Sequence, residues 1–127
     1  YLDWGRENFR LNRLDGKQHN FRQVDSLEFL QKAKEKYDLA YIDPPTYSNS
    51  KERKSDFDVQ RDHRELIRRA AALMNRGGMI IFCTNYTKFN LDSLDDLGLE
   101  IEEITRETLP PDFGRRGKAH RAFRIRV

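Results

Sequence analysis

Apolar residues recur at three- and four-residue intervals between Val59 and Asn75, the spacing of one face of an α-helix. An earlier helix is predicted to open at Asp25 and Ser26, with Glu28 completing a capping-box pattern. The apolar positions near the start of the chain fit a further helix, and a short one is indicated before the last third. Helices are therefore expected over residues 1–16, 25–36, 59–75 and 91–97.

Apolar runs of strand length alternate with these helices. The runs Tyr37–Asp43 and Met79–Thr84 are apolar enough to be buried on both faces, as strands of a parallel sheet usually are. Two later segments alternate in the manner of closing strands, and the last of them is compatible with antiparallel pairing. The order of elements predicts an α/β fold with a mainly parallel sheet and crossover helices. Strands are expected over residues 20–24, 37–43, 79–84, 99–105 and 119–127.

The run Asp43-Pro44-Pro45-Thr46-Tyr47 follows the second expected strand directly. Neither proline can donate to a ladder, so the strand must end there, at the sheet edge where open α/β folds bind their ligands. The stiff turn carries an acid before it and an aromatic ring after it, a combination that suits a flat polar ligand such as a nucleobase. The alternative is a strand that ends in a proline turn, with the tyrosine packed on the surface.

Three polar residues follow successive expected strands: Asp25, Asp43 and Asn85. Because the carboxyl ends of parallel strands line one crevice, these side chains are expected to converge there. Simple capping of the following helix is an equally good reading of Asp25, and the two roles are compatible.

The 127-residue chain is 35% charged and carries 24 Lys and Arg against 21 Asp and Glu, a net charge of +3. This excess permits a nucleic-acid partner without requiring one. Two basic groups could clamp a phosphate backbone if they lie near the crevice, although charged runs are commonly solvated loops. These groups are Lys51, Arg53 and Lys54, and Arg115, Arg116, Lys118 and Arg121.

The single cysteine, Cys83, lies within an expected buried strand, where cysteine is more often a small hydrophobe than a nucleophile. His63 lies on the apolar stripe of its helix and is expected to be a core residue with its polar atoms satisfied. No pair of histidines has the spacing of metal ligands, so no metal site is predicted. With no apolar run long enough to cross a membrane and no visible signal peptide, a cytoplasmic protein is expected.

The Asp-Pro-Pro motif after a strand, preceded by a strand with Asp25, resembles the Class I S-adenosylmethionine-dependent methyltransferases. Three further stretches are similar to the C-terminal half of the bifunctional 23S rRNA guanine methyltransferases of bacteria, the K/L type. These stretches are residues 1–12 with their Tyr-Leu-Asp-Trp start, residues 46–63, and Thr108-Leu109 with Asp112-Phe113. The resemblance runs over essentially the whole chain.

The resemblance implies a Rossmann-like sheet of seven strands, one antiparallel, of which residues 1–127 would supply the last five within a single methyltransferase domain. The glycine loop and the ribose-binding acid of the family would lie before Tyr1. It further implies S-adenosylmethionine as methyl donor and 23S rRNA and upstream domains of the same polypeptide as partners. Asp25, Ser26 and Leu27 would contact the adenine end of the cofactor. Asp43, Pro44, Pro45 and Tyr47 would lie beside the transferred methyl, and Thr46 and Asn85 beside the RNA.

Three functions stay open from the sequence. Methyltransferases that modify exocyclic amines usually carry an aromatic residue directly after Pro-Pro, whereas here Thr46 intervenes, which favours guanine N7 over an amine target. A cytosine-5 RNA methyltransferase would need a nucleophilic cysteine after the Gly-Gly strand, where this chain has Asn85, and Cys83 lies two residues earlier. A non-catalytic RNA-binding module with the same fold is the third possibility.

Overall fold

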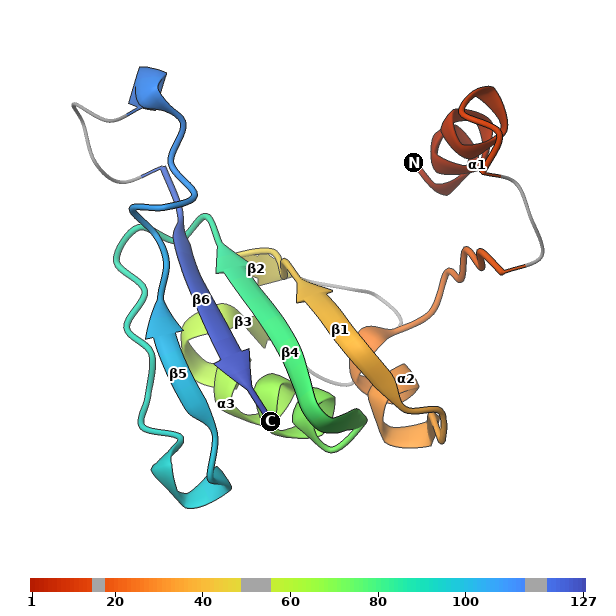
Figure 1. The fold of residues 1–127 in the computed structure, drawn as a ribbon. Helices are drawn as coiled ribbons and strands as arrows, with labels where there is room; N and C mark the ends of the chain where they lie inside the picture. The colour runs from red at the N-terminus through yellow and green to blue at the C-terminus, as the bar shows by residue number, and fades with distance from the viewer. Residues whose placement is uncertain (15–17, 49–55, 114–118) are drawn as a thin grey trace. The chain divides into compact units, whose positions relative to one another are not determined.

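The computed structural model describes residues 1–14, 18–48, 56–113 and 119–127. These residues form two compact units, Tyr1–Lys32 and Ala33–Val127. The first unit is helical, and the second contains the sheet (Figure 1).

The first unit contains α1 (Leu2–Leu11) and α2 (Ser26–Lys32). Between them, residues 20–24 pair with no strand among the described residues, so the strand expected there is not formed. The segment is instead held by packing, because the Phe21 ring meets the Phe9 ring of α1 edge to face at 4.8 Å. A strand needs a partner ladder, and this contact with a helix supplies none.

The second unit is built on a four-stranded sheet with the order β1-β4-β6-β5 (Figure 1). β1 pairs in parallel with β4, and β6 is antiparallel to both β4 and β5. Three strands therefore run in one direction and only β6 opposes them, which confirms the predicted sheet with one antiparallel strand. The strands are β1 (Tyr37–Ile42), β4 (Met74–Thr84), β5 (Glu100–Glu103) and β6 (Arg121–Arg126).

A small antiparallel ribbon that the sequence analysis did not predict follows β1. It pairs β2 (Tyr47–Ser48) with β3 (Phe57–Asp58). The two strands stand on either side of a polar segment rich in Lys and Arg. The Val59 N–H donates to the Thr46 carbonyl at 3.1 Å and closes the base of the ribbon.

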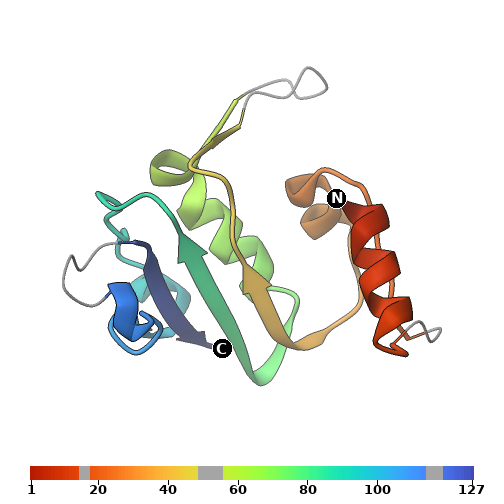
Figure 2. The same cartoon turned by 90° about the horizontal axis from the view of Figure 1, so that it is seen from above.

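The long helix α3 (Val59–Ala71) begins directly after this ribbon and covers one face of the sheet (Figure 2). Asp58 caps it, since Asp58 Oδ1 accepts from the Arg61 N–H at 3.0 Å. The apolar side of the helix packs on inward-facing residues of β4 and β6, and this interface is the core of the unit. Its fully or almost fully buried members are Val59, Leu66, Ile67, Ala70, Ile80, Phe82, Phe123 and Ile125.

The helix ends at Ala71 rather than Asn75, and β4 begins at Met74 rather than Met79. The Tyr37 N–H donates to the Leu73 carbonyl at 2.9 Å, and Tyr37 pairs with Met74. Because the backbone at Leu73 and Met74 is already paired with β1, it cannot also continue α3. Gly77 then takes a φ of +78°, a conformation that other residues rarely adopt.

Two further expectations need correction. The helix expected over residues 91–97 is a single 3-10 turn, Asp95–Leu97, and a similar turn forms at Pro111–Phe113. β1 is not buried on both faces, because Leu39 and Tyr41 are 60% and 66% exposed. These side chains lie on the face of the sheet that α3 does not cover.

The cap of α3 can be tested by substitution. Asp58→Ala should lower the free energy of unfolding by about 1 kcal/mol, because the Arg61 N–H loses its acceptor. Asp58→Asn keeps a side-chain oxygen and should lose less. Urea unfolding followed by circular dichroism measures both variants, and an equal loss would show that the oxygen cap is not what stabilises the helix start.

Candidate functional site

The candidate site lies at the carboxyl edge of β1 and β4. These two strands are adjacent and parallel, with Ile42 opposite Phe82. Asp43 follows β1 directly and Asn85 follows β4 directly, so the two residues leave the sheet at the same edge. Both side chains are exposed. The structure therefore brings together two of the three polar residues that the sequence predicts at the crevice.

The Pro-Pro turn leads from this edge into the ribbon. Tyr47 on β2 donates its hydroxyl to Asp56 Oδ2 at 2.6 Å, and this hydrogen bond raises the pKa of Tyr47. The tyrosine ring remains 55% exposed. It is thus held at its hydroxyl end while its ring stays accessible, which suits a stacking contact with a planar ligand.

Asp25 belongs to the first unit, where it caps α2. Its Oδ1 accepts from the Glu28 N–H at 3.0 Å, and its carbonyl accepts from the Phe29 N–H at 2.8 Å. The predicted capping is therefore confirmed. The convergence of Asp25 on the edge that carries Asp43, and the predicted cofactor contacts of Asp25, Ser26 and Leu27, remain predictions.

Cys83 lies on the open face of the sheet rather than inside a buried layer. It alternates with Phe82 and Thr84, which are fully buried on the α3 side, and it is itself half-buried. A hydrogen bond between Tyr41 and Cys83 is the main cause that raises the pKa of Tyr41 to about 12, and the nearby charge of Asp43 adds to it. The expectation of a fully buried cysteine is wrong because this face is only partly covered: Ala122, the partner of Cys83 on β6, is fully buried, whereas Tyr41 on β1 is 66% exposed.

The segment from Asn85 to Ser93, called here the β4 loop, forms the next part of the site. The Tyr86 N–H donates to Thr84 Oγ1 at 3.2 Å, and the Phe89 N–H donates to the Tyr86 carbonyl at 2.9 Å. These bonds define two tight turns that begin at the end of β4. The loop then places the Phe89 side chain, 1% exposed, in the core.

Phe89 packs among three rings from different elements. Its ring centroid lies 4.7 Å from that of His63 on α3, 5.6 Å from Phe82 on β4 and 5.9 Å from Phe123 on β6. Each such aromatic contact contributes roughly 0.5–1.5 kcal/mol beyond the buried area. The cluster fixes the middle of the β4 loop to the core.

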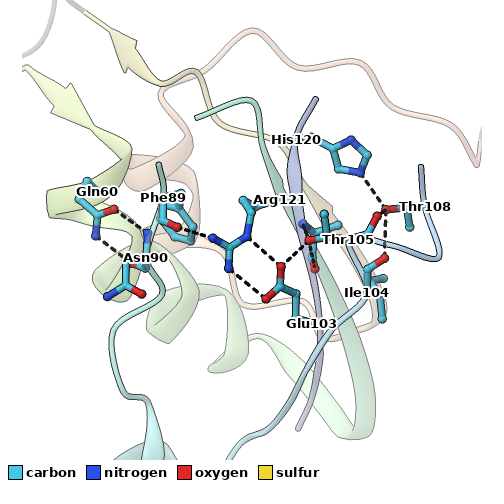
Figure 3. Close-up of polar contacts among 10 residues, drawn as sticks. Gln60, Phe89, Asn90, Glu103, Ile104, Thr105, Thr108, His120 and Arg121 are labelled. Atoms are coloured by element: carbon cyan, nitrogen blue, oxygen red, sulfur yellow. Dashed lines mark hydrogen bonds and ion pairs between the residues drawn. The ribbon is translucent and has the colours of Figure 1, made fainter. Parts of the chain in front are cut away.

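Polar contacts from α3 hold the same loop. Gln60 Nε2 donates to the Asn90 carbonyl at 2.8 Å, while its Oε1 accepts from the Asn90 N–H at 2.9 Å (Figure 3). His63 Nε2 accepts from the Asp92 N–H at 3.0 Å. Arg64 donates to the Ser93 carbonyl and pairs with Asp96 at 2.6 Å.

His63 is fully buried, as the sequence predicts for a core histidine. Its Nδ1 lies 3.0 Å from the Val59 carbonyl and 2.9 Å from the Gln60 carbonyl. Since Nε2 accepts and both neighbours of Nδ1 are acceptors, the pattern assigns the proton to Nδ1 of a neutral ring. His63 therefore fastens the β4 loop to α3.

Arg121 on β6 holds the loop from the other side (Figure 3). Its Nη1 donates to the Phe89 carbonyl at 2.7 Å, while Nε and Nη2 donate to the two carboxylate oxygens of Glu103 at 2.8 and 3.0 Å. Thr105 also donates to Glu103, and hydrogen bonds from Arg121 and Thr105 lower the pKa of Glu103. Arg121 is the one basic candidate residue that the described part of the chain contains.

The rest of the predicted basic groups lies outside the described residues. His120, a neighbour of the second group, has its Nε2 2.8 Å from Thr108 Oγ1. Gln60, Glu103 and Thr105 also belong to this region, and no sequence pattern indicated them. Glu103 and Arg121 stand on two expected strands, but their pairing depends on a register that single-sequence patterns do not give. The residues outside the description are Lys51, Arg53, Lys54, Arg115, Arg116 and Lys118.

Within the described ranges, no group of three or more His, Cys, Asp and Glu side chains is placed to hold a metal ion. The helices within those ranges are too short or too polar to span a membrane.

Two curated proteins are similar to almost the whole chain. The "Ribosomal RNA large subunit methyltransferase K/L" of Syntrophotalea carbinolica is 47% identical over 125 residues, 98% of this chain and 18% of that protein. The protein of the same name from a Marinomonas species is 43% identical over 126 residues, 99% of this chain and again 18% of the relative. The chain thus spans less than a fifth of the length of these relatives.

Solved structures show the same fold. SMU.776, a protein assigned as a methyltransferase and crystallised with SAH, matches 95% of this chain and 35% of its own at a TM-score of 0.71 and 23% identity. A protein from Streptococcus mutans, assigned as a SAM-dependent methyltransferase, matches 95% of this chain and 34% of its own at 0.67 and 22%. The model of the S-adenosylmethionine-dependent methyltransferase family matches residues 1–121. With this match over nearly its full length, the chain belongs to the S-adenosylmethionine-dependent methyltransferase family.

Proposed function

We propose that this chain forms the substrate side of an rRNA methyltransferase domain that transfers a methyl group to guanine N7 of 23S rRNA. The observation that carries the proposal is the shared edge of β1 and β4, where the Asp43-Pro44-Pro45 turn and Asn85 leave the sheet side by side. The names of the two curated relatives support ribosomal RNA of the large subunit as the substrate.

The donor set of the described residues fits the methyl donor of the family. Asp43 contributes a carboxylate, and the turn contributes two backbone carbonyls, at the edge of the sheet where α/β folds bind their ligands. These groups can accept hydrogen bonds from amino and hydroxyl groups. Asp25, Ser26 and Leu27 offer a carboxylate, a helix start and an apolar side chain for the adenine end. When bound, the cofactor supplies a sulfonium methyl that a nucleophile can accept.

Guanine N7 is a nucleophile that needs little chemical activation by the protein. The N7 atom bears no proton and has a lone pair in the plane of the ring. Methyl transfer to it therefore requires neither a general base nor a covalent adduct. Catalysis then consists mainly of orienting the base in line with the methyl group. The exposed ring of Tyr47, Thr46 and the stiff Pro44-Pro45 turn are suited to that task, with the base presented outside its stack.

The placement of Cys83 favours N7 over a cytosine-5 target. A cytosine-5 mechanism needs a thiolate that attacks the base from the crevice. Cys83 instead lies on the face of the sheet away from α3, in contact with Tyr41. Asn85 is the residue that directly follows β4. The basic residues outside the described ranges, Lys51, Arg53, Lys54, Arg115, Arg116 and Lys118, would contact the RNA backbone.

The first test concerns the turn and the ring in the full-length enzyme. Asp43→Ala should lower the single-turnover rate sharply, because the crevice loses its carboxylate. Asp38→Ala, at the opposite end of β1 where Asp38 pairs with Asn75 at 2.7 Å, is the matched control and should keep the rate. Equal rates for Asp43→Ala and wild type would contradict the assignment.

The ring of Tyr47 is expected to stack on a base. Tyr47→Ala should weaken binding of the substrate RNA by roughly 1–3 kcal/mol. Tyr47→Phe keeps the ring and loses only the hydrogen bond to Asp56, so it should bind RNA nearly as wild type does. Filter binding with an rRNA transcript separates the two variants, and equal losses would rule out stacking as the cause.

A further prediction concerns residues 1–127 alone. Since the family's glycine loop and ribose-binding acid are expected before Tyr1, this segment should bind S-adenosylmethionine weakly and transfer no methyl group. Isothermal titration calorimetry of the segment against the full-length enzyme measures the difference. Tight stoichiometric binding by the segment would show that residues 1–127 contain the complete cofactor site.

Cys83 decides between the two enzymatic mechanisms. Cys83→Ala and Cys83→Ser should keep substantial activity in the full-length enzyme, because transfer to N7 needs no thiolate. Nuclease digestion and mass spectrometry should identify 7-methylguanosine as the product. RNA that carries 5-fluorocytosine should form no covalent complex, and an adduct that disappears in Cys83→Ala would overturn the N7 assignment.

A further inference from the structure

We infer that Arg121 is a positioning residue for the methyl transfer, which acts through the β4 loop, rather than a ligand of an RNA phosphate. The inference rests on the proposed function, since it assigns a role in the same site. It replaces the phosphate contact that the excess of basic residues predicts for Arg121.

The contacts of the guanidinium carry this inference. All three nitrogens of the Arg121 fork already donate within the protein, to both oxygens of Glu103 and to the Phe89 carbonyl. The same group lies over the Phe123 ring, 5.4 Å from its centroid. A bidentate pair of this geometry fixes the plane of the guanidinium, which leaves Nη1 directed at the loop carbonyl.

The position of Arg121 in the sheet explains why it contacts the β4 loop. Arg121 is paired with Thr84, the last residue of β4, and the β4 loop begins at the next residue, Asn85. The loop comes back to the start of β6 only at Phe89. The Phe89 carbonyl needs a hydrogen-bond donor there. Arg121 therefore closes the short stretch Asn85–Phe89 at its far end, while Thr84 Oγ1 holds its near end.

The closed stretch begins at the same edge of the sheet as Asp43, because β1 and β4 are adjacent and parallel. Asn85 is its first residue, and Thr87 and Lys88 form its exposed tip. Gln60 holds the adjoining Asn90 through two hydrogen bonds from α3. With supports from both α3 and β6, the loop is preorganised to present Asn85 at a fixed place.

The chain offers a matched control in the same two strands. Arg124 on β6 pairs with Glu102 on β5 at 2.6 Å, as Arg121 pairs with Glu103. The register places Arg124 opposite Ile81, on the face of the sheet away from α3. Arg124 donates to Glu102 and Glu107, both outside the β4 loop. Substitutions there remove an equivalent ion pair without touching the loop.

The experiment uses the full-length enzyme, tritiated S-adenosylmethionine and an unmodified 23S rRNA transcript. Arg121→Lys and Glu103→Gln should each lower the single-turnover rate constant at saturating RNA on the order of 10- to 100-fold. The slope of log binding constant against log salt should stay as in wild type, because no phosphate contact is lost. Arg124→Lys and Glu102→Gln should stay within about 2-fold of the wild-type rate.

Substitutions of Arg121 and Glu103 separate positioning from phosphate binding. If Arg121 bound a phosphate, Arg121→Lys would keep the charge and most of the activity, and Arg121→Gln would reduce the salt slope by about 1. Glu103→Gln would then bind RNA as tightly as wild type or more tightly, since a negative charge is lost. Those results would overturn the inference and leave the proposed function intact.

Hydrogen exchange provides a readout that does not depend on activity. Peptides that cover the β4 loop should exchange faster in Arg121→Lys and Glu103→Gln than in the two controls. Unchanged exchange in both variants would also overturn the inference. Failure of the wild-type enzyme to methylate any rRNA guanine would contradict the proposed function alone, because the exchange measurement still reports whether Arg121 fixes the loop.

Discussion

The packing of Phe89 against His63, Phe82 and Phe123 is the contact on which the site depends. Phe89 is a loop residue, yet its side chain is as buried as those of the strands around it. A loop that contributes a ring to the core cannot move without opening that core, so its backbone inherits the stability of the sheet and of α3. This explains how a loop at the sheet edge is held in a defined position.

Burying this ring also brings the loop backbone into a region with little water, where its polar groups need partners. The side chains that meet this need come from both sides of the loop. Gln60 and His63 reach it from α3, and Arg121 reaches it from β6. The bonds from His63 and Arg121 are part-buried and satisfy loop groups that the aromatic packing has drawn inward, whereas the bonds from Gln60 lie at the surface.

The local patterns of the sequence predicted much of this arrangement, because they report on local physics. Helical periodicity identified α3, the acid and Glu28 identified the start of α2, and the Pro-Pro turn identified the end of β1. The burial of His63 followed from its place on the apolar stripe. The position of Asp43 and Asn85 at one edge followed from the alternation of strands and helices, since neighbouring parallel strands end at the same side.

What could not be predicted depends on contacts between distant residues. The β2–β3 ribbon has strands of only two residues each, too short to show an alternating pattern. The expected strand at residues 20–24 has suitable side chains, but its environment offers a ring of α1 instead of a partner strand. The pairing of Glu103 with Arg121 depends on the register of β5 and β6, which places both side chains on the α3 side.

The two faces of the sheet carry different kinds of side chain. Toward α3, β4 and β6 carry Ile80, Phe82, Phe123 and Ile125, which exclude water and support the β4 loop. On the opposite face the same strands carry Cys83 and Arg124, and the apolar half of that face continues onto Tyr41 of β1. The side chains of Arg121 and Arg124 are similarly exposed, at 25% and 28%, so the parity of the strand position decides their partners rather than their burial. Arg121 and Arg124, three positions apart on β6, fall on opposite faces, so Arg121 contacts the β4 loop whereas Arg124 pairs with Glu102 and Glu107.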